Sequence, residues 1–205
     1  MKLKLIIAGI IGIAIALAMI LFSGPTIVDR PEKGTNIIAF GDSLVTGYGV
    51  TTLGDDFVSL LSKRTGRTII NAGSNGDTTA SALARLDRDV LSQDPRIVIV
   101  LVGGNDALRQ VPVEESFKNL VLIVDRIHEK GAAVILLGVK GSLLGDKYDS
   151  EFKKLAKEKK ANFVPNILKD IFGNPEMLTD GIHPNNAGHA IMADRIEPIL
   201  KKLLQ

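Results

Sequence analysis

From residue 36 onward, short apolar runs alternate with longer segments whose apolar residues recur every three or four positions. The most strand-like run reads IVIVLV, at residues 97–102. The clearest periodic segment, residues 114–130, places Phe117 and Val124 on one face of a helix. Runs that are apolar on both faces, linked by helices, are typical of a parallel sheet that is covered on both sides.

The predicted elements alternate along the whole of this region. Strands are expected at residues 36–40, 68–72, 97–102, 133–139 and 162–164. Helices are expected at residues 55–64, 78–91, 114–130, 150–160 and 187–204, the last kinked at Pro198. The pattern therefore predicts an α/β fold, a three-layer α/β/α sandwich with about five parallel strands.

The beginning of the chain has a different pattern. Lys2 and Lys4 precede an uninterrupted apolar run, Leu5–Phe22. A basic end followed by an apolar run is typical of an export signal. As a helix this run would span about 27 Å, close to the ~30 Å hydrocarbon core of a bilayer. The sequence therefore predicts a transmembrane or signal helix.

The quality of the possible cleavage sites decides between these two. A cut after Ala18 would leave an apolar new terminus, and a cut after Gly24 would place Pro25 directly behind the cut. We therefore expect residues 1–24 to be a signal anchor in the cytoplasmic membrane. The alternative is a cleaved signal peptide, which would make the protein secreted. In both cases the rest of the chain is expected on the exported side, periplasmic or extracellular.

Length and composition limit the remaining possibilities. The 205 residues suffice for one domain, expected at residues 36–205 behind a linker at residues 25–35. The net charge of +2 is carried by Lys2 and Lys4, so the exported part is neutral and no nucleic-acid partner is indicated. The chain has no cysteine, which excludes disulfides, zinc thiolates and a thiol nucleophile.

Three polar turns follow the first three predicted strands. Because ligands bind beyond the carboxyl ends of parallel strands, these turns are candidates for a site. They read Gly41-Asp42-Ser43-Leu44, Asn71-Ala72-Gly73-Ser74 and Gly103-Gly104-Asn105-Asp106. The same residue types also reverse the chain and cap helices. The turns alone therefore leave two interpretations of Ser43, a nucleophile or a turn residue.

A serine nucleophile requires a base, normally a histidine that is oriented by a carboxylate. Of the three histidines, His128 ends a predicted helix, where a structural role is expected, and His189 begins the last helix, on the surface or partly buried. His183 precedes that helix and lies three residues after Asp180. A turn could bring this carboxylate to one ring nitrogen and leave the other facing outward. A helix cap beside a surface histidine would have the same spacing.

Taken together, these motifs resemble those of the SGNH (GDSL) hydrolases, and most closely their arylesterase, thioesterase I and lysophospholipase L1 branch. The matching stretches are GDSLVTGYG, NAGSNGDTTASALARL, VGGNDALR and DGIHPNNAGH, in the order of the family. The resemblance implies a flavodoxin-like SGNH hydrolase fold and a serine esterase that needs neither metal nor cofactor. Its substrates would be carboxylic esters, acyl thioesters or lysophospholipids, whether small molecules or lipids.

The resemblance also implies a role for each matching residue. Ser43 would be the nucleophile, His183 the base and Asp180 the residue that orients it. The oxyanion hole would consist of the backbone N–H of Ser43, the N–H of Gly73 and the side-chain amide of Asn105.

Some alternatives remain beside this prediction. The same residues could deacetylate an envelope carbohydrate, or the fold could serve as a non-catalytic binding module. The nucleophile elbow of α/β-hydrolases fits poorly, because Val45 stands where its second glycine belongs. A metal held by Asp180, His183 and His189 matches no familiar spacing. Lys140-Gly141 departs from the proline-rich text of relatives, which leaves the acyl preference open.

Overall fold

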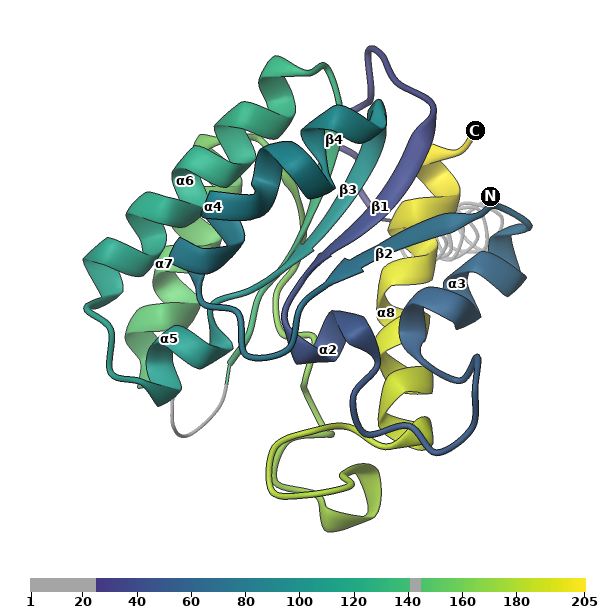
Figure 1. Cartoon of the computed structure of the whole chain (residues 1–205), viewed down its shortest axis with the longest axis vertical. Coiled ribbons are helices and arrows are strands. Elements are labelled where there is room, and N and C mark those ends of the chain that lie inside the picture. The colour runs from purple at the N-terminus through teal and green to yellow at the C-terminus, as the bar shows by residue number, and fades with distance from the viewer. Residues whose placement is uncertain (1–24, 141–144) are drawn as a thin grey trace, which may run out of the picture.

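Five parallel strands form a single sheet in the computed structural model, which describes residues 25–140 and 145–205 (Figure 1). The strands are β1 (Asn36–Gly41), β2 (Ile69–Gly73), β3 (Pro95–Leu101), β4 (Ala133–Leu137) and β5 (Asn162–Val164), in the order β2-β1-β3-β4-β5. Every neighbouring pair is parallel. The prediction of an α/β fold with five parallel strands is therefore confirmed.

The expected signal anchor at residues 1–24 lies outside the described residues. Within residues 25–140 and 145–205, no helix is both long and apolar enough to cross a membrane.

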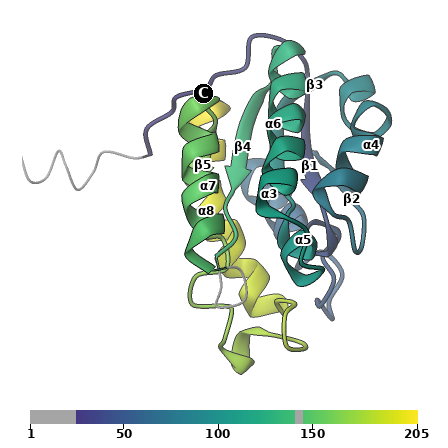
Figure 2. The same cartoon turned by 90° about the vertical axis from the view of Figure 1, so that its left-hand side faces the viewer.

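Helices cover both faces of the sheet. On one face lie α4 (Thr79–Asp89), α6 (Val113–Glu129) and α7 (Gly145–Glu158), which Figure 2 shows side by side. On the other face α3 (Phe57–Thr65) packs against α8 (Asn186–Leu203), which contains Pro198. Right-handed crossovers produce this division, because the chain moves from β1 to one edge strand and later from β3 to the other. Two short helices, α2 (Ser43–Thr46) and α5 (Gly104–Leu108), follow β1 and β3 directly.

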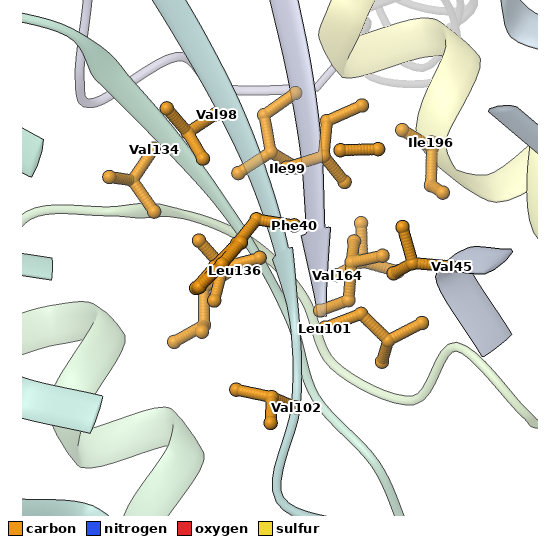
Figure 3. Close-up of a cluster of buried hydrophobic side chains, with 14 of the residues drawn as sticks. Phe40, Val45, Val98, Ile99, Leu101, Val102, Val134, Leu136, Val164 and Ile196 are labelled. Carbon is orange, nitrogen blue, oxygen red and sulfur yellow. The ribbon is translucent and has the colours of Figure 1, made fainter. Parts of the chain in front are cut away.

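The core consists of side chains from both faces of the sheet. In Figure 3, Phe40, Val98 and Val134 lie on one side of the strands, and Leu101 and Ile196 lie on the other. All five side chains are completely buried. Burying a side chain of this size contributes about 1.5–3 kcal/mol. Because both faces are covered, β3 has no polar face beyond Arg96, and this is why residues 97–101 are an unbroken apolar run.

The carboxyl ends of β1, β2 and β3 meet at one edge of the sheet. Gly41 is in register with both Gly73 and Leu101. A side chain on Gly41 would collide with the carbonyl oxygen of Leu101. Only glycine therefore allows β1 and β3 to lie this close together at their carboxyl ends. The three polar turns that the sequence singles out therefore emerge next to one another.

Residues 25–35, the predicted linker, are bound along the amino ends of the strands, and we call them the N-terminal strap. Lys202 Nζ donates to the Pro25 carbonyl at 2.7 Å. Asp29 Oδ2 accepts from the N–H of Val134 at 2.6 Å, and the Asp29 carbonyl accepts from Asn162 Nδ2 at 2.8 Å. The strap is therefore bound to segments that each lie more than a hundred residues after it in the sequence.

His128 takes part in the same contacts. Its Nε2 lies 3.0 Å from Asp29 Oδ2, and both side chains are largely shielded from solvent. The structural role expected for this histidine is consistent with that pairing.

Asp42 is a buried carboxyl group at the carboxyl edge. Its Oδ1 accepts a hydrogen bond from the N–H of Leu44 at 3.0 Å and so caps α2. Burial raises the pKa of Asp42 to about 7, although the bond from Leu44 opposes this shift. The nearby charges of Asp77 and Asp106 raise the pKa further.

Replacing Asp29 with alanine is expected to lower the free energy of unfolding by about 1–3 kcal/mol, because the buried N–H of Val134 loses its acceptor. Urea unfolding would measure this change. Glu32→Ala, an exposed side chain of the same strap, is the matched control and should change the stability little. Equal stabilities of the two variants would contradict the structural role of the strap.

Replacing Asp42 with asparagine is expected to stabilise the protein increasingly as the pH rises. In the unfolded chain Asp42 ionises near pH 4, whereas the folded protein keeps its proton until about pH 7. The wild type therefore loses stability from this group between those two values, and the variant, which keeps an acceptor for Leu44, does not. Unfolding free energies at pH 4.5, 6 and 8 would measure the difference. A constant difference would show that Asp42 is ionised in the folded state.

Candidate active site

Ser43, the predicted nucleophile, is the first residue of α2 and is separated from the end of β1 by Asp42 alone. The cap formed by Asp42 fixes the start of this helix. Gly47 ends it with a left-handed backbone at φ 83°, which glycine adopts without strain. Ser43 is only partly buried, so this one-turn helix presents its side chain at the carboxyl edge.

The structure brings Ser43, His183 and Asp180 together in one line of contacts. Ser43 Oγ lies 3.0 Å from His183 Nε2, and His183 Nδ1 lies 2.7 Å from Asp180 Oδ2. With Nδ1 protonated, the ring donates to the carboxylate and its Nε2 accepts from the serine hydroxyl. Such an arrangement can remove the hydroxyl proton when Ser43 attacks a carbonyl carbon.

Asp180 is held as an acceptor by the turn that it begins. Its Oδ1 accepts from the N–H groups of Ile182 and His183, each at 2.8 Å. The bond from the Ile182 N–H, followed by those from the side chain and backbone of His183, lowers the pKa of Asp180 to about 2. The carboxylate is therefore ionised at neutral pH, as a partner of a histidine that gains a proton must be.

Tyr48 also contacts His183, and the sequence analysis did not single it out. The two ring centroids are 4.5 Å apart with an interplanar angle of 55°. Thr179 Oγ1 donates to the Gly49 carbonyl at 2.5 Å and joins the two loops beside this contact. Tyr48 belongs to the GDSLVTGYG stretch, but an aromatic residue in a loop does not indicate which side chain it will contact in the fold.

Asn105 lies in α5, after β3, and lines the same pocket as Ser43. Its Nδ2 donates one hydrogen to the Asp77 carbonyl at 2.9 Å, which leaves a second amide hydrogen. The neighbouring Asp106 is buried and accepts from the N–H and hydroxyl of Thr79 at 2.8 and 2.6 Å. These bonds fix α5 against the beginning of α4.

Gly73 differs from its predicted role as a free oxyanion donor. Its N–H already donates to Asn71 Oδ1 at 3.0 Å. A side chain at Gly73 would lie 2.5 Å from the backbone nitrogen of Thr46, so the glycine permits α2 to approach β2 closely. The backbone donor of Gly73 is thus engaged within its own turn, and the missing side chain leaves room for α2.

Gly76, in the turn that follows, was missed by the sequence analysis. Its N–H donates no hydrogen bond to another residue that the structure describes. Its φ of 78° lies in the left-handed region, where glycine is favoured. The next residue, Asp77, is the one whose carbonyl binds Asn105. Gly73 and Gly76 lie in the same polar stretch after β2, and only Gly76 is followed by aspartate, which was the available signal.

An apolar pocket of about 70 Å³ opens beside Ser43 and His183. Its apolar wall is formed by Leu44, Leu108, Val139, Leu168, Phe172 and Ile182, and Lys140 also lines it. The residues come from segments after β1, β3, β4 and β5. The pocket thus offers an apolar surface directly next to a hydroxyl and an imidazole.

His189 is completely buried and lies behind the loop that contains Tyr48. Its Nδ1 accepts from the N–H of Phe57 at 3.3 Å, and its Nε2 lies 3.5 Å from the Tyr48 carbonyl. Burial lowers the pKa of His189, so the neutral ring is favoured. The expectation of a surface or partly buried residue understated this burial, because the loop that covers it lies far away in the sequence.

Three relatives show how far the similarity to known proteins extends. The chain is 32% identical over 189 residues to esterase TesA of Pseudomonas aeruginosa, covering 87% of this chain and 94% of that protein. It is 29% identical over 182 residues to thioesterase 1/protease 1/lysophospholipase L1 of Escherichia coli, covering 85% and 88%. Acetylxylan esterase of Geobacillus stearothermophilus is 27% identical over 204 residues, covering 85% and 90%.

The fold and the sequence profile agree with these relatives. The crystal structure of TesA superposes with a TM-score of 0.77 at 29% identity, covering 82% of this chain and 99% of that one. Residues 39–191 match the profile of the GDSL-like lipase/acylhydrolase family, and this range includes Ser43, Asn105, Asp180 and His183. The chain therefore belongs to the GDSL-like lipase/acylhydrolase family and is a hydrolase of that family.

Proposed function

We propose that the protein hydrolyses carboxylic esters, acyl thioesters or lysophospholipids through an acyl-enzyme on Ser43. The observation that carries this proposal is the line of contacts from Ser43 Oγ to His183 and on to Asp180, at 3.0 and 2.7 Å. The names of the relatives, an esterase and a thioesterase/lysophospholipase, support the same substrate classes.

The first half of the reaction forms the acyl-enzyme. His183 Nε2 takes the hydroxyl proton while Ser43 Oγ attacks the carbonyl carbon, and the carbonyl π electrons move onto its oxygen. The ionised Asp180 stabilises the positive imidazolium that results. His183 then gives the proton to the departing oxygen or sulfur, and the carbonyl re-forms as the leaving group separates.

The second half repeats these steps with water. His183 accepts a proton from a water molecule, whose oxygen attacks the acyl-enzyme carbonyl. The proton then returns to Ser43 Oγ as its bond to the acyl carbon breaks. The products are a free acid and an enzyme in its starting state, so the cycle requires no further reactant.

The negative charge on the carbonyl oxygen needs fixed donors. We assign these to the N–H of Ser43, the second amide hydrogen of Asn105 and the N–H of Gly76, which takes the place of Gly73. The choice of Gly76 follows from its N–H, which donates to none of the residues that the structure describes, and from its place beside the residue that binds Asn105. Each donor of this kind contributes about 2.7–4 kcal/mol to transition-state stabilisation.

The pocket supports an acyl group as the part of the substrate that it binds. Its wall is largely apolar, which disfavours a sugar there, and its volume of about 70 Å³ is sufficient for a short acyl group. The same small pocket would accept an acetyl group of a carbohydrate, as the similarity to an acetylxylan esterase suggests. Carbohydrate deacetylation is therefore the second candidate function. A non-catalytic binding module is disfavoured by the intact contacts of Ser43.

The cellular location follows from the sequence of residues 1–24. The basic start and the apolar run Leu5–Phe22 support export and a signal anchor in the cytoplasmic membrane. The hydrolase domain at residues 36–205 would then act on the periplasmic or extracellular side. The neutral charge of this domain gives no indication of a nucleic-acid partner.

Replacing Ser43 with alanine is expected to lower kcat by roughly 10⁶-fold, because the acyl-enzyme can no longer form. Hydrolysis of p-nitrophenyl esters from acetate to palmitate would measure this, and the wild-type rate should be highest for the short chains. Ser92→Ala, an exposed serine, is the matched control and should retain full activity. Equal rates for Ser43→Ala and the wild type would exclude the proposed nucleophile.

Replacing Asn105 with alanine is expected to lower kcat by about 10²–10³-fold with little change in KM, because the amide binds the oxygen mainly when it becomes negative. Steady-state kinetics with p-nitrophenyl acetate would show the division between kcat and KM. A rise in KM at constant kcat would instead assign Asn105 to ordinary substrate binding.

A further inference from the structure

Arg85 is a nearly buried cation that none of the proposed catalytic steps uses. It lies in α4, and only 11% of its side chain is exposed. Its guanidinium carbon is 4.4 Å from the centre of the Phe40 ring, on the face of β1 that α4 covers. A buried charge is costly unless it is well paired, so its contacts indicate what it is placed to do.

The guanidinium donates to four groups. Its Nη2 donates to the Gly41 carbonyl and its Nη1 to the Ala72 carbonyl, each at 2.9 Å. Its Nε donates to Asp77 Oδ2 at 2.5 Å, and Nη1 also lies 2.9 Å from Asp89 Oδ2. The planar guanidinium of Arg85 therefore binds the carboxyl ends of β1 and β2 and the side chain of Asp77, which lies in the turn after β2.

Three of these four partners, all but Asp89, lie next to residues of the site. Gly41 precedes Asp42, which caps the helix of Ser43. Ala72 opens the turn that leads to Gly76. Asp77 accepts the side-chain hydrogen bond of Asn105 with its own carbonyl at 2.9 Å. The guanidinium thus binds the end of β1, just before Ser43. Through Asp77 it is also connected to the side-chain amide of Asn105.

The geometry of arginine suits this task. Its planar group has five N–H donors in fixed directions, whereas a lysine ammonium is a compact point charge. The carbonyls of Gly41 and Ala72 lie at the ends of β1 and β2, where the ladder between the strands stops. Arg85 supplies donors to both at once and so fixes the distance between the two turns.

We propose that Arg85 is a positioning residue, which keeps the turn of Ser43 and the amide of Asn105 at the separation that oxyanion binding requires. The proposal rests on the proposed function. Arg85 is not among the residues that line the pocket, so it acts through its neighbours and not on the substrate. A displacement of about 1 Å between catalytic groups can cost ~10²-fold in rate.

The first test compares Arg85→Met with the wild-type full chain in hydrolysis of p-nitrophenyl acetate. We expect kcat to fall about 10- to 100-fold while KM changes less than about threefold. Arg85→Lys should not restore kcat, because one ammonium cannot replace the planar group. Circular dichroism at the assay temperature would establish that each variant is folded. If Arg85→Met does not fold, Arg85→Lys carries the test.

Arg88→Met is the matched control. Arg88 lies in the same helix and pairs with the same Asp89, at 2.6 and 2.9 Å, but 77% of its side chain is exposed. It makes no contact with the ends of β1 and β2 within the described residues. Its replacement should leave kcat unchanged. An equal loss in Arg88→Met would attribute the effect to the ion pair with Asp89 and overturn the proposal.

A double-mutant cycle with Asn105→Ala separates positioning from general stabilisation. If Arg85 acts through the amide, Arg85→Met should cost no more than about threefold in the Asn105→Ala background, because the interaction that it supports is already absent. Full additivity of the two losses would show a merely structural role and overturn the proposal. Activity that survives in Ser43→Ala would instead overturn the proposed function, whatever the cycle shows.

Discussion

The pairing of β1 with β2 on one side and β3 on the other is the constraint on which the candidate site depends. β1 lies at the point where the strand order reverses, so the chain leaves it toward one edge and returns past it toward the other. Sheets of this kind bind ligands beyond the carboxyl ends of the strands at such a point. The register of Gly41 with Gly73 and Leu101 brings three turns to the same height. Without that register, Ser43 and Asn105 would not share a pocket.

The strands β1, β3 and β4 could be predicted from the sequence because they are buried on both faces. Ile99 and Val100 are neighbours that point to opposite sides, and both are completely buried. Their apolar character therefore extends along the whole strand. The pairing of Asp180 with His183 was also predictable, since three residues of turn are enough to close it. Helix boundaries were less so: α7 begins at Gly145, whereas the pattern places its start at residue 150.

Other features depend on contacts between distant segments, which local patterns do not contain. Asn71 engages the N–H of Gly73 with its side chain, and no spacing in the sequence distinguishes this from a free donor. The ring of Tyr48 meets His183 across 135 positions of the chain, which no local motif encodes. The N-terminal strap has the composition of a linker, yet Asp29 finds partners in β4 and β5. In each case the partner, not the residue itself, decides the role.

The N-terminal strap also fixes the point at which the chain enters the hydrolase domain. It runs along the amino ends of the strands, whereas Ser43 lies at their carboxyl ends, so the two are at opposite poles of the sheet. Lys202 Nζ donates to the carbonyl of Pro25, so the first described residue is itself held at the amino pole. A chain anchored through residues 1–24, as proposed, would therefore be tethered at the pole of the sheet opposite Ser43.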